Sequence, residues 1–252
     1  MDAWRWAAAR AVGTSHLAAG TPCQDAVAAC GIDGPAGPVL AAAVSDGAGS
    51  ARFGREGARA VVRSVLREAE RWFAAADRLP DVNEAMEWLD AVRADVASLA
   101  AAREAEPRDF AATLVAAFAG PEATLILHVG DGAAVIDGPD GWEVASWPAG
   151  GEYAGTTYFV TDDPVPRLRI TVLERPTAAI ALFSDGIETL VLDPAERRPA
   201  DRWFELMFAM LRGSDEAGRD RKLCRMLRWY LRRPELDERT DDDKSLLLAI
   251  RR

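Results

Sequence analysis

The chain has 252 residues, of which 49% are hydrophobic, and its 40 Asp and Glu outweigh its 30 Lys and Arg to give a formal net charge of −10. Such an acidic chain is a poor candidate for nucleic-acid binding, because attraction to phosphates needs a basic surface. No apolar run approaches the roughly 20 residues that span a bilayer, and the first residues lack a signal-peptide pattern. We therefore expect a soluble, cytoplasmic protein with neither nucleic-acid nor membrane partners.

Few side chains could serve as nucleophiles or as soft metal ligands. The three cysteines, Cys23, Cys30 and Cys224, are too few and too scattered for a disulfide framework or a zinc knuckle, and none has an arginine six residues later, as a cysteine phosphatase would. The only histidines are His16 and His128, which excludes an H-E-x-x-H zinc site, and the chain has no P-loop. A bound metal would need oxygen ligands, which favours Mg²⁺, Mn²⁺ or Ca²⁺ over zinc.

The first part of the chain predicts strands followed by a helical hairpin. Apolar residues recur at helical spacing over 58–76 and again over 82–99, and Asp81 with Glu84 forms a capping pair at the start of the second helix. Apolar runs separated by Gly- and Pro-rich turns precede these helices. They predict an edge strand over 4–12, a loop over 13–24, and strands over 25–30 and 38–45.

The texture changes to short strands between 111 and 180, and helical spacing returns afterwards, with Gly213 at a helix C-terminus. The predicted strands are 112–119, 123–129, 133–136, 142–145, 156–160, 169–172, 178–183 and 245–250, and the predicted helices are 201–211 and 217–231. This grouping predicts an α+β fold with two stacked sheets and helices on their outer faces. No long linker or internal repeat divides the chain, so we expect one domain over 1–252.

Six aspartates are followed by glycine, which is a preferred hairpin turn. Three of them, Asp33, Asp137 and Asp140, fall between predicted strands and are expected in turns. Asp46 and Asp185 differ, because each directly follows a continuous apolar strand and leads toward a helix. A carboxylate at the end of a buried strand is held rigidly, as a metal ligand should be, and the glycine beside it permits close approach.

Further aspartates stand at comparable positions. Asp131 lies between two predicted strands, and Asp241, Asp242 and Asp243 come just before the last one. A run of three aspartates alone is typical of a solvated loop. Several aspartates at strand ends, in an acidic and histidine-poor chain, are better explained together by a metal centre.

These motifs, in this order, resemble those of the PP2C phosphatases, and the match runs from about residue 13 to residue 250. A bacterial subgroup that begins Gly-x-Ser-His…Pro-Cys-Gln-Asp is especially similar to the start of the chain. The matching segments are Gly13-Thr14-Ser15-His16, Pro22-Cys23-Gln24-Asp25-Ala26, Val44-Ser45-Asp46-Gly47, Phe110-Ala111-Ala112-Thr113-Leu114, Gly130-Asp131-Gly132, Ser184-Asp185-Gly186 and Asp242-Asp243-Lys244-Ser245.

The resemblance implies an αββα sandwich, in which helices flank two stacked antiparallel sheets, with two Mn²⁺ or Mg²⁺ ions at one end. It also implies a third, weaker metal site. Asp46 would bridge the two ions with the Gly47 carbonyl as a further ligand, Asp185 and Asp242 would hold the other metal, Asp25 would orient metal-bound water, and Asp131 would serve the third ion.

The implied activity is that of a metal-dependent serine/threonine phosphoprotein phosphatase, a phosphoric monoester hydrolase of bacterial signalling. Hydroxide bridging the two metals would attack phosphorus, and the metals would neutralise phosphoryl charge. The partners would be a phosphorylated protein and an opposing Ser/Thr kinase. Two alternatives stay open: a PP2C-like regulatory or scaffold protein with little turnover, and a small-molecule phosphomonoesterase that uses the same site.

The chain departs from the family pattern where the substrate phosphate is recognised. His16 stands where the family has a phosphate-clamping arginine, Gly132-Ala133 replaces the usual Ser-Arg after Asp131, and Asp243 replaces a common Asn. His16 could bind the phosphate, donate a proton to the leaving oxygen, or be an ordinary loop histidine. If it is a bystander, Arg52 or Arg55 could supply the missing cation.

A glycine-rich stretch over 150–157 lies where the family carries its variable flap. It could be a simple hairpin or the wall of a substrate groove, and the sequence does not favour one over the other.

Overall fold

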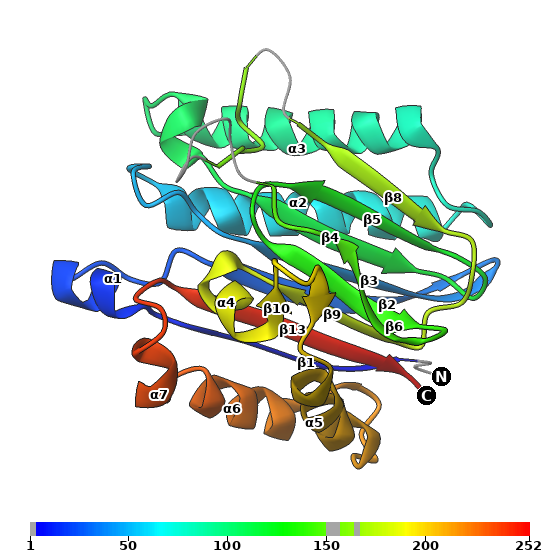
Figure 1. Ribbon diagram of the computed structural model, residues 1–252. Helices are drawn as coiled ribbons and strands as arrows, with labels where there is room; N and C mark the ends of the chain where they lie inside the picture. Colours follow the sequence, from blue (N-terminus) through cyan, green and yellow to red (C-terminus); the bar gives the residue numbers. More distant parts are fainter. Residues whose placement is uncertain (1–3, 150–156, 164–166) are drawn as a thin grey trace.

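The computed structural model describes residues 4–149, 157–163 and 167–252. Two sheets are stacked face to face, and a pair of long helices covers the outer face of each, above and below in Figure 1. Within these described residues, the strand pairs of the two sheets are antiparallel except a short parallel one between residues 5–6 and 218–219. The predicted αββα sandwich is confirmed.

The first sheet has five strands and lies under the helical hairpin. Its strand order is β2 (Ala26–Gly34), β3 (Gly37–Ser45), β4 (Leu114–Ala119), β5 (Thr124–Val129) and β8 (Arg169–Leu173). The hairpin helices are α2 (Gly54–Phe73) and α3 (Val82–Ala102). The predicted capping box is present, with Glu84 N donating to Asp81 Oδ1 at 2.9 Å and Asp81 N donating to Glu84 Oε2 at 2.7 Å.

The second sheet has six strands and is covered by the C-terminal helices. Its order is β12 (Gly218–Arg219), β1 (Trp4–Ala11), β13 (Lys244–Arg251), β9 (Ala179–Phe183), β6 (Ala133–Gly138) and β7 (Gly141–Ser146). The covering helices are α5 (Asp201–Arg212) and α6 (Arg221–Tyr230).

Short elements connect the layers. They are α1 (Thr14–Ala19), η1 (Pro107–Phe110), η2 (Asp185–Ile187), α4 (Glu188–Val191), α7 (Pro234–Asp237) and a two-stranded ladder of β10 (Leu192–Asp193) with β11 (Arg198–Pro199). Within the described ranges, no helix combines the length and the apolarity that crossing a bilayer requires.

The apolar core lies in three layers. One fills the space between the sheets, where Leu40, Ile126 and Leu247 are fully buried. The other two lie between each sheet and its helices. In the layer between the five-stranded sheet and its helices, Trp88 of α3 packs edge to face on Phe118 of β4, with the ring centroids 5.2 Å apart. Because both faces of each sheet are covered, the central strands read as continuous apolar runs and not as alternating ones.

Several predictions of local structure need correction. The 13–24 segment contains α1, which buries none of its residues and so leaves no apolar periodicity to detect. β1 is not an edge strand, since β12 pairs with it over two residues. Gly213 does end α5, as predicted, but at φ −80°, without the left-handed conformation that favours glycine. The predicted helix over 58–76 ends at Phe73.

The expected strand over 156–160 does not form in its described part, 157–160. Single bonds satisfy this backbone in place of a ladder: Val160 N donates to the Ala112 carbonyl at 2.9 Å, and Arg93 Nη1 donates to the Val160 carbonyl at 2.9 Å. Asp33 and Asp137 are further corrections, because they lie within β2 and β6 and not in turns. Asp137 accepts from the backbone N–H groups of Ala178 and Ala179 at 2.9 and 2.7 Å.

Candidate active site

Strand register brings the predicted aspartates to one end of the sandwich. Ala26 of β2 pairs with Ser45 of β3, so the residues just outside the pair, Asp25 and Asp46, are neighbours. Phe183 of β9 pairs both with Ala133 of β6 and with Leu246 of β13. The loops that carry Asp131, Asp185 and Asp242 therefore open at the same end.

Asp25 is the most deeply buried of these carboxylates, with 0% of the residue exposed. Ser184 Oγ donates to its Oδ2 at 2.8 Å, and Ser245 N donates to Ser184 Oγ at 3.0 Å. Its Oδ1 is buried without a hydrogen-bond partner. Burial raises the pKa of Asp25 to about 6, although a side-chain contact with Asp46 acts to lower it. Sequence reasoning missed the role of both serines, although each stands within a recognised motif.

Asp46 is fixed through its backbone by Thr113. Thr113 N donates to the Asp46 carbonyl at 2.8 Å, and Asp46 N donates to Thr113 Oγ1 at 2.9 Å. A Cβ on Gly47 would lie 2.3 Å from the backbone of Gly54, so only glycine lets the start of α2 approach this loop. Burial, then repulsion from Asp25 and Asp185, raises the pKa of Asp46 well above its usual range.

Asp185 begins η2 and is half-buried. Burial, then repulsion from Asp131 and Asp242, raises its pKa to about 8, and its Oδ1 is buried without a hydrogen-bond partner. A Cβ on the next residue, Gly186, would lie 1.9 Å from the Asp243 carbonyl oxygen, which explains the glycine at this strand end.

Asp131 and Glu188 complete the patch. Burial raises the pKa of Asp131, opposed by a hydrogen bond from the Thr157 hydroxyl. Burial and repulsion from Asp131 raise the pKa of Glu188, one helical turn after Asp185. Sequence reasoning did not identify Glu188, and its spacing from Asp185 is the signal that could have found it.

This end of the molecule suits a hard divalent cation by its chemistry. Its donors are all oxygens, they repel one another, and Asp25 and Asp185 each hold an unpartnered buried oxygen. Such a set matches the preference of Mg²⁺ and Mn²⁺. Among the described residues, no three carboxylate, thiol or imidazole groups converge as a metal-binding cluster. The side chains thus form a dense carboxylate patch but not a preformed coordination sphere.

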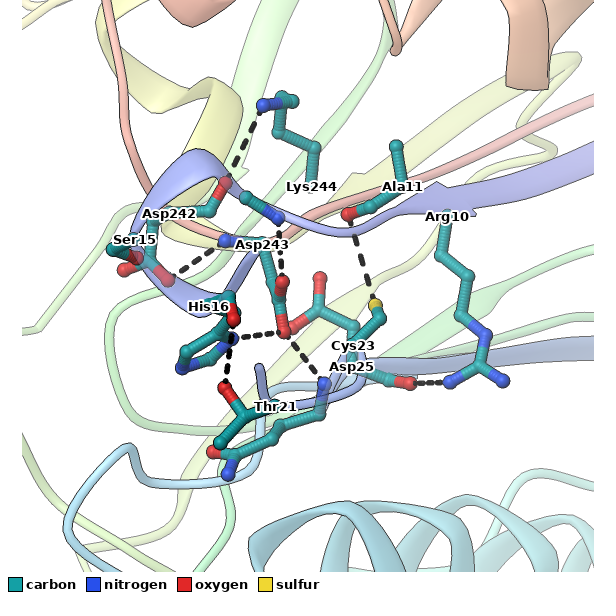
Figure 2. A network of polar contacts seen from close by, with 12 residues as sticks. Arg10, Ala11, Ser15, His16, Thr21, Cys23, Asp25, Asp242, Asp243 and Lys244 are labelled. Carbon is teal, nitrogen blue, oxygen red and sulfur yellow. Dashed lines mark hydrogen bonds and ion pairs between the residues drawn. The ribbon is translucent and has the colours of Figure 1, made fainter. Parts of the chain in front are cut away.

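His16 faces Asp243 across the loop that precedes β2 (Figure 2). Its Nδ1 lies 2.8 Å from Asp243 Oδ2, although the ring is not oriented for a hydrogen bond. Asp243 is 1% exposed and also accepts from Gly13 N at 2.7 Å and from Gln24 N at 2.5 Å. No contact recorded within the described ranges joins His16 to Asp46, Asp185 or Asp242.

The buried Lys244 supports the loop that carries Asp242. Its Nζ donates to Asp237 Oδ1 of α7 at 2.7 Å and reaches the Asp242 carbonyl at 3.4 Å, the contact drawn in Figure 2. Lys244 is 0% exposed, so this pair fixes the loop from inside the molecule.

Arginines border the patch. Arg10 of β1 donates to the Asp25 carbonyl, as Figure 2 shows, and sequence reasoning missed it. Arg55 is the residue after Gly54, whose backbone lies against Gly47, and its Nε is buried without a hydrogen-bond partner. Arg52 is exposed and lies over the Phe53 ring at 4.7 Å. The predicted flap over 150–157 lies outside the described residues except for Thr157.

Solved structures share this architecture. A serine/threonine phosphatase of S. agalactiae superposes with a TM-score of 0.64 over 99% of this chain and 100% of its own, at 14% identity. The catalytic domain of the serine/threonine protein phosphatase PstP, determined with two manganese ions, gives 0.60 over 98% and 97%, at 20% identity. The fold is therefore that of the metal-dependent protein phosphatases.

The sequence comparisons are more specific. The family model for protein phosphatase 2C matches residues 12–228. Serine/threonine-protein phosphatase 3 of Escherichia coli (strain K12) is 36% identical over 253 residues, which cover 98% of each chain. The chain belongs to the protein phosphatase 2C family. The predicted family and enzyme class, a metal-dependent protein phosphatase, are confirmed.

Proposed function

We propose that this phosphatase hydrolyses phosphoserine and phosphothreonine in proteins at the carboxylate patch. Two Mn²⁺ or Mg²⁺ ions would be held by Asp46, the Gly47 carbonyl, Asp185 and Asp242, and a weaker third ion by Asp131. The observation that carries this proposal is Asp185, a carboxylate with an unpartnered buried oxygen that faces repulsion from Asp131 and Asp242. Such a group is costly unless a cation offsets its charge.

Divalent cations, when bound, lower the pKa of water and offset phosphoryl charge. The protein's own contribution is positioning. Asp25 has one oxygen occupied by Ser184 and the other unpartnered, so it can accept a proton from a water and orient it. Thr113 keeps the Asp46 backbone rigid from both sides, as a ligand needs.

Phosphate capture rests on cations near the start of α2. An arginine clamp offers two parallel N–H donors to a phosphate. Arg55 has a buried donor without a partner and adjoins Asp46 through the Gly47–Gly54 contact. We therefore favour Arg55 as a contact to the substrate phosphate. His16, held against Asp243, is better suited to proton donation than to clamping.

The physiological partners follow from this activity. The substrate would be a phosphoprotein with an opposing Ser/Thr kinase, and the whole of 1–252 would act as one catalytic domain. The cytoplasmic location expected from the sequence stays a prediction.

The test compares wild type with Asp46→Asn on phosphoserine, phosphothreonine and phosphotyrosine peptides, with Mn²⁺, with Mg²⁺ and with chelator. Asp46→Asn keeps the volume but removes charge that hard cations need, so we expect nearly complete loss of activity with an unchanged circular dichroism spectrum. Asp33→Asn, at the end of the β2–β3 hairpin, is the matched control.

Other outcomes would correct the proposal. Wild-type turnover by Asp46→Asn at saturating Mn²⁺ would refute the metal assignment. Hydrolysis of p-nitrophenyl phosphate without peptide turnover would indicate a small-molecule phosphatase. Mn²⁺ binding without any turnover would indicate a regulatory protein.

A further inference from the structure

An apolar groove lies between α5 and α6, on the face of the molecule below the second sheet in Figure 1. Its cavity has a volume of about 670 Å³, and its lining includes Trp203, Leu206 and Met210 of α5 with Met226 and Trp229 of α6. Leu206 and Trp229 are 63% and 69% exposed. The carboxylate patch contributes no residue to this groove.

Leu206, Met226 and Trp229 are exposed and surplus to the core, whereas Trp203 and Met210 pack against it only in part. α5 already buries Phe204 and Phe208, and α6 already buries Leu223 and Leu227, against the second sheet. Trp203, Leu206 and Met210 form a second apolar stripe at helical spacing on the outward side. A surface helix normally keeps that side polar. Exposed apolar surface of this kind marks an interaction site.

The segment that forms one wall of the groove, α6 and the residues after it, is unusually basic. Residues 221–233 contain six basic side chains and no acidic one, in a chain of net charge −10; the six are Arg221, Lys222, Arg225, Arg228, Arg232 and Arg233. Arg225 itself lines the groove. Of the six, only Arg233 forms an ion pair with another described residue, Glu235 at 2.9 Å.

On the other helical face several arginines are paired, although Arg59 and Arg63 of α2 form no ion pair with a described residue. Arg67 of α2 pairs with Asp95 of α3 at 2.6 Å, and Arg103 pairs with Glu56 at 2.8 Å. Arg225, which lines the groove, forms no ion pair with a described residue, so its charge is available to a partner.

We propose that this groove binds an acidic amphipathic helical segment of another protein, with apolar side chains inserted between α5 and α6 and carboxylates against the basic run. A helix laid in a groove is a recurring mode of recognition, with anchors at i, i+3, i+4 and i+7. The cavity falls within the range of about 300–1,000 Å³ that encloses several inserted groups.

Two other occupants fit less well. A membrane surface is met by a helix whose apolar face is buried in the lipid boundary, whereas here Trp203 and Met210 line a hollow between two helices. A symmetric dimer would bring the same patch of two copies together. It would then oppose two unpaired basic runs, which costs free energy.

The test uses a fluorescein-labelled peptide of about 16 residues, four helical turns, with Leu or Phe at the anchor positions and Glu elsewhere. Fluorescence anisotropy is measured with wild type, Trp229→Ala and Arg225→Glu, at low and high salt. A peptide with Lys in place of Glu is the charge control. Arg108→Glu, on η1, is the matched protein control, since its side chain is 81% exposed.

We expect saturable binding of the acidic peptide that either groove variant weakens at least about tenfold, as for a central anchor residue. High salt should weaken it too, and Arg108→Glu should not. All variants should keep wild-type hydrolysis of p-nitrophenyl phosphate, so failure of this proposal and failure of the phosphatase assignment are distinguishable.

Three results would overturn the inference. The first is peptide binding that is insensitive to Trp229→Ala and Arg225→Glu, or equal for the Lys peptide. The second is flotation with phosphatidylserine vesicles, lost in Trp229→Ala, without peptide binding. The third is a dimer by light scattering that Trp229→Ala dissociates.

Discussion

Replacing Asp185 with Asn should stabilise the chelated protein while it abolishes activity. Burial and the neighbours Asp131 and Asp242 raise the pKa of Asp185 from its ordinary 3.8 to about 8. Because the folded pKa lies above the unfolded one, folding at neutral pH forces the carboxyl group to take up a proton. This proton uptake lowers the free energy of unfolding. The loss is absent below about pH 4, grows by about 1.4 kcal/mol per pH unit, and levels off above about pH 8.

Since pH 7 lies about three pH units above the unfolded pKa, the loss for wild type reaches about 4 kcal/mol at that pH. An asparagine does not titrate, so with chelator present Asp185→Asn should be more stable than wild type by up to about 4 kcal/mol. The difference should shrink toward pH 5. Mn²⁺ at 100 times its Kd should return about 2.7 kcal/mol to wild type. The variant should gain much less, since it lacks a ligand charge.

The measurement is urea unfolding of wild type and Asp185→Asn at about pH 5.5, 7 and 8, with chelator and with Mn²⁺. Asp140→Asn, at an exposed turn, is the control and should change neither stability nor activity. A chelated Asp185→Asn that is less stable than wild type at every pH would refute the reasoning about charge repulsion. Equal stabilisation of both proteins by Mn²⁺ would remove Asp185 from the ligand set.

Three further results are expected. If Asp131 serves the weaker ion, as proposed, Asp131→Ala should cut turnover but leave tight Mn²⁺ binding by calorimetry unchanged; unchanged specific activity would contradict this. His16→Ala should slow phosphopeptides more than p-nitrophenyl phosphate, whose leaving group needs little protonation, and His16→Arg should restore activity only if the role is a clamp. Burial and Arg169 lower the pKa of His128 to about 3, so stability should fall as pH drops from about 6.5 toward 3; His128→Gln should flatten that urea-unfolding profile, and an unchanged slope would contradict it.

The layers and the carboxylate patch could be predicted from the sequence because the signals for both are local. Strands such as β3 are buried on both faces and therefore read as continuous apolar runs. The aspartates could be grouped because each stands immediately outside such a strand. The observed register, with Ala26 opposite Ser45, supplies what the sequence could not, namely which strand ends are neighbours.

Contacts between segments that are distant in the chain could not be predicted from the sequence. Thr113 holds Asp46 from 67 residues away, and Ser184 holds Asp25 from 159 residues away. Neither bond leaves a local pattern, since a threonine or serine next to a strand is unremarkable until its partner is known. Likewise α1 buries nothing, so no periodicity distinguishes it from a loop.

The two departures from the family pattern that looked separate in the sequence, His16 and Asp243, belong to one contact. Both Asp243 oxygens accept a backbone N–H, Oδ1 from Gly13 and Oδ2 from Gln24, and Oδ2 also meets the imidazole. An asparagine here would turn its NH₂ group toward one of those donors and leave it unpaired, which is costly in a buried site. An aspartate therefore suits this position at the start of β13, because the 13–24 loop brings two N–H donors and a histidine against its carboxylate. A change at residue 16 should be read together with residue 243, because the carboxylate that contacts the imidazole also holds the loop that carries it.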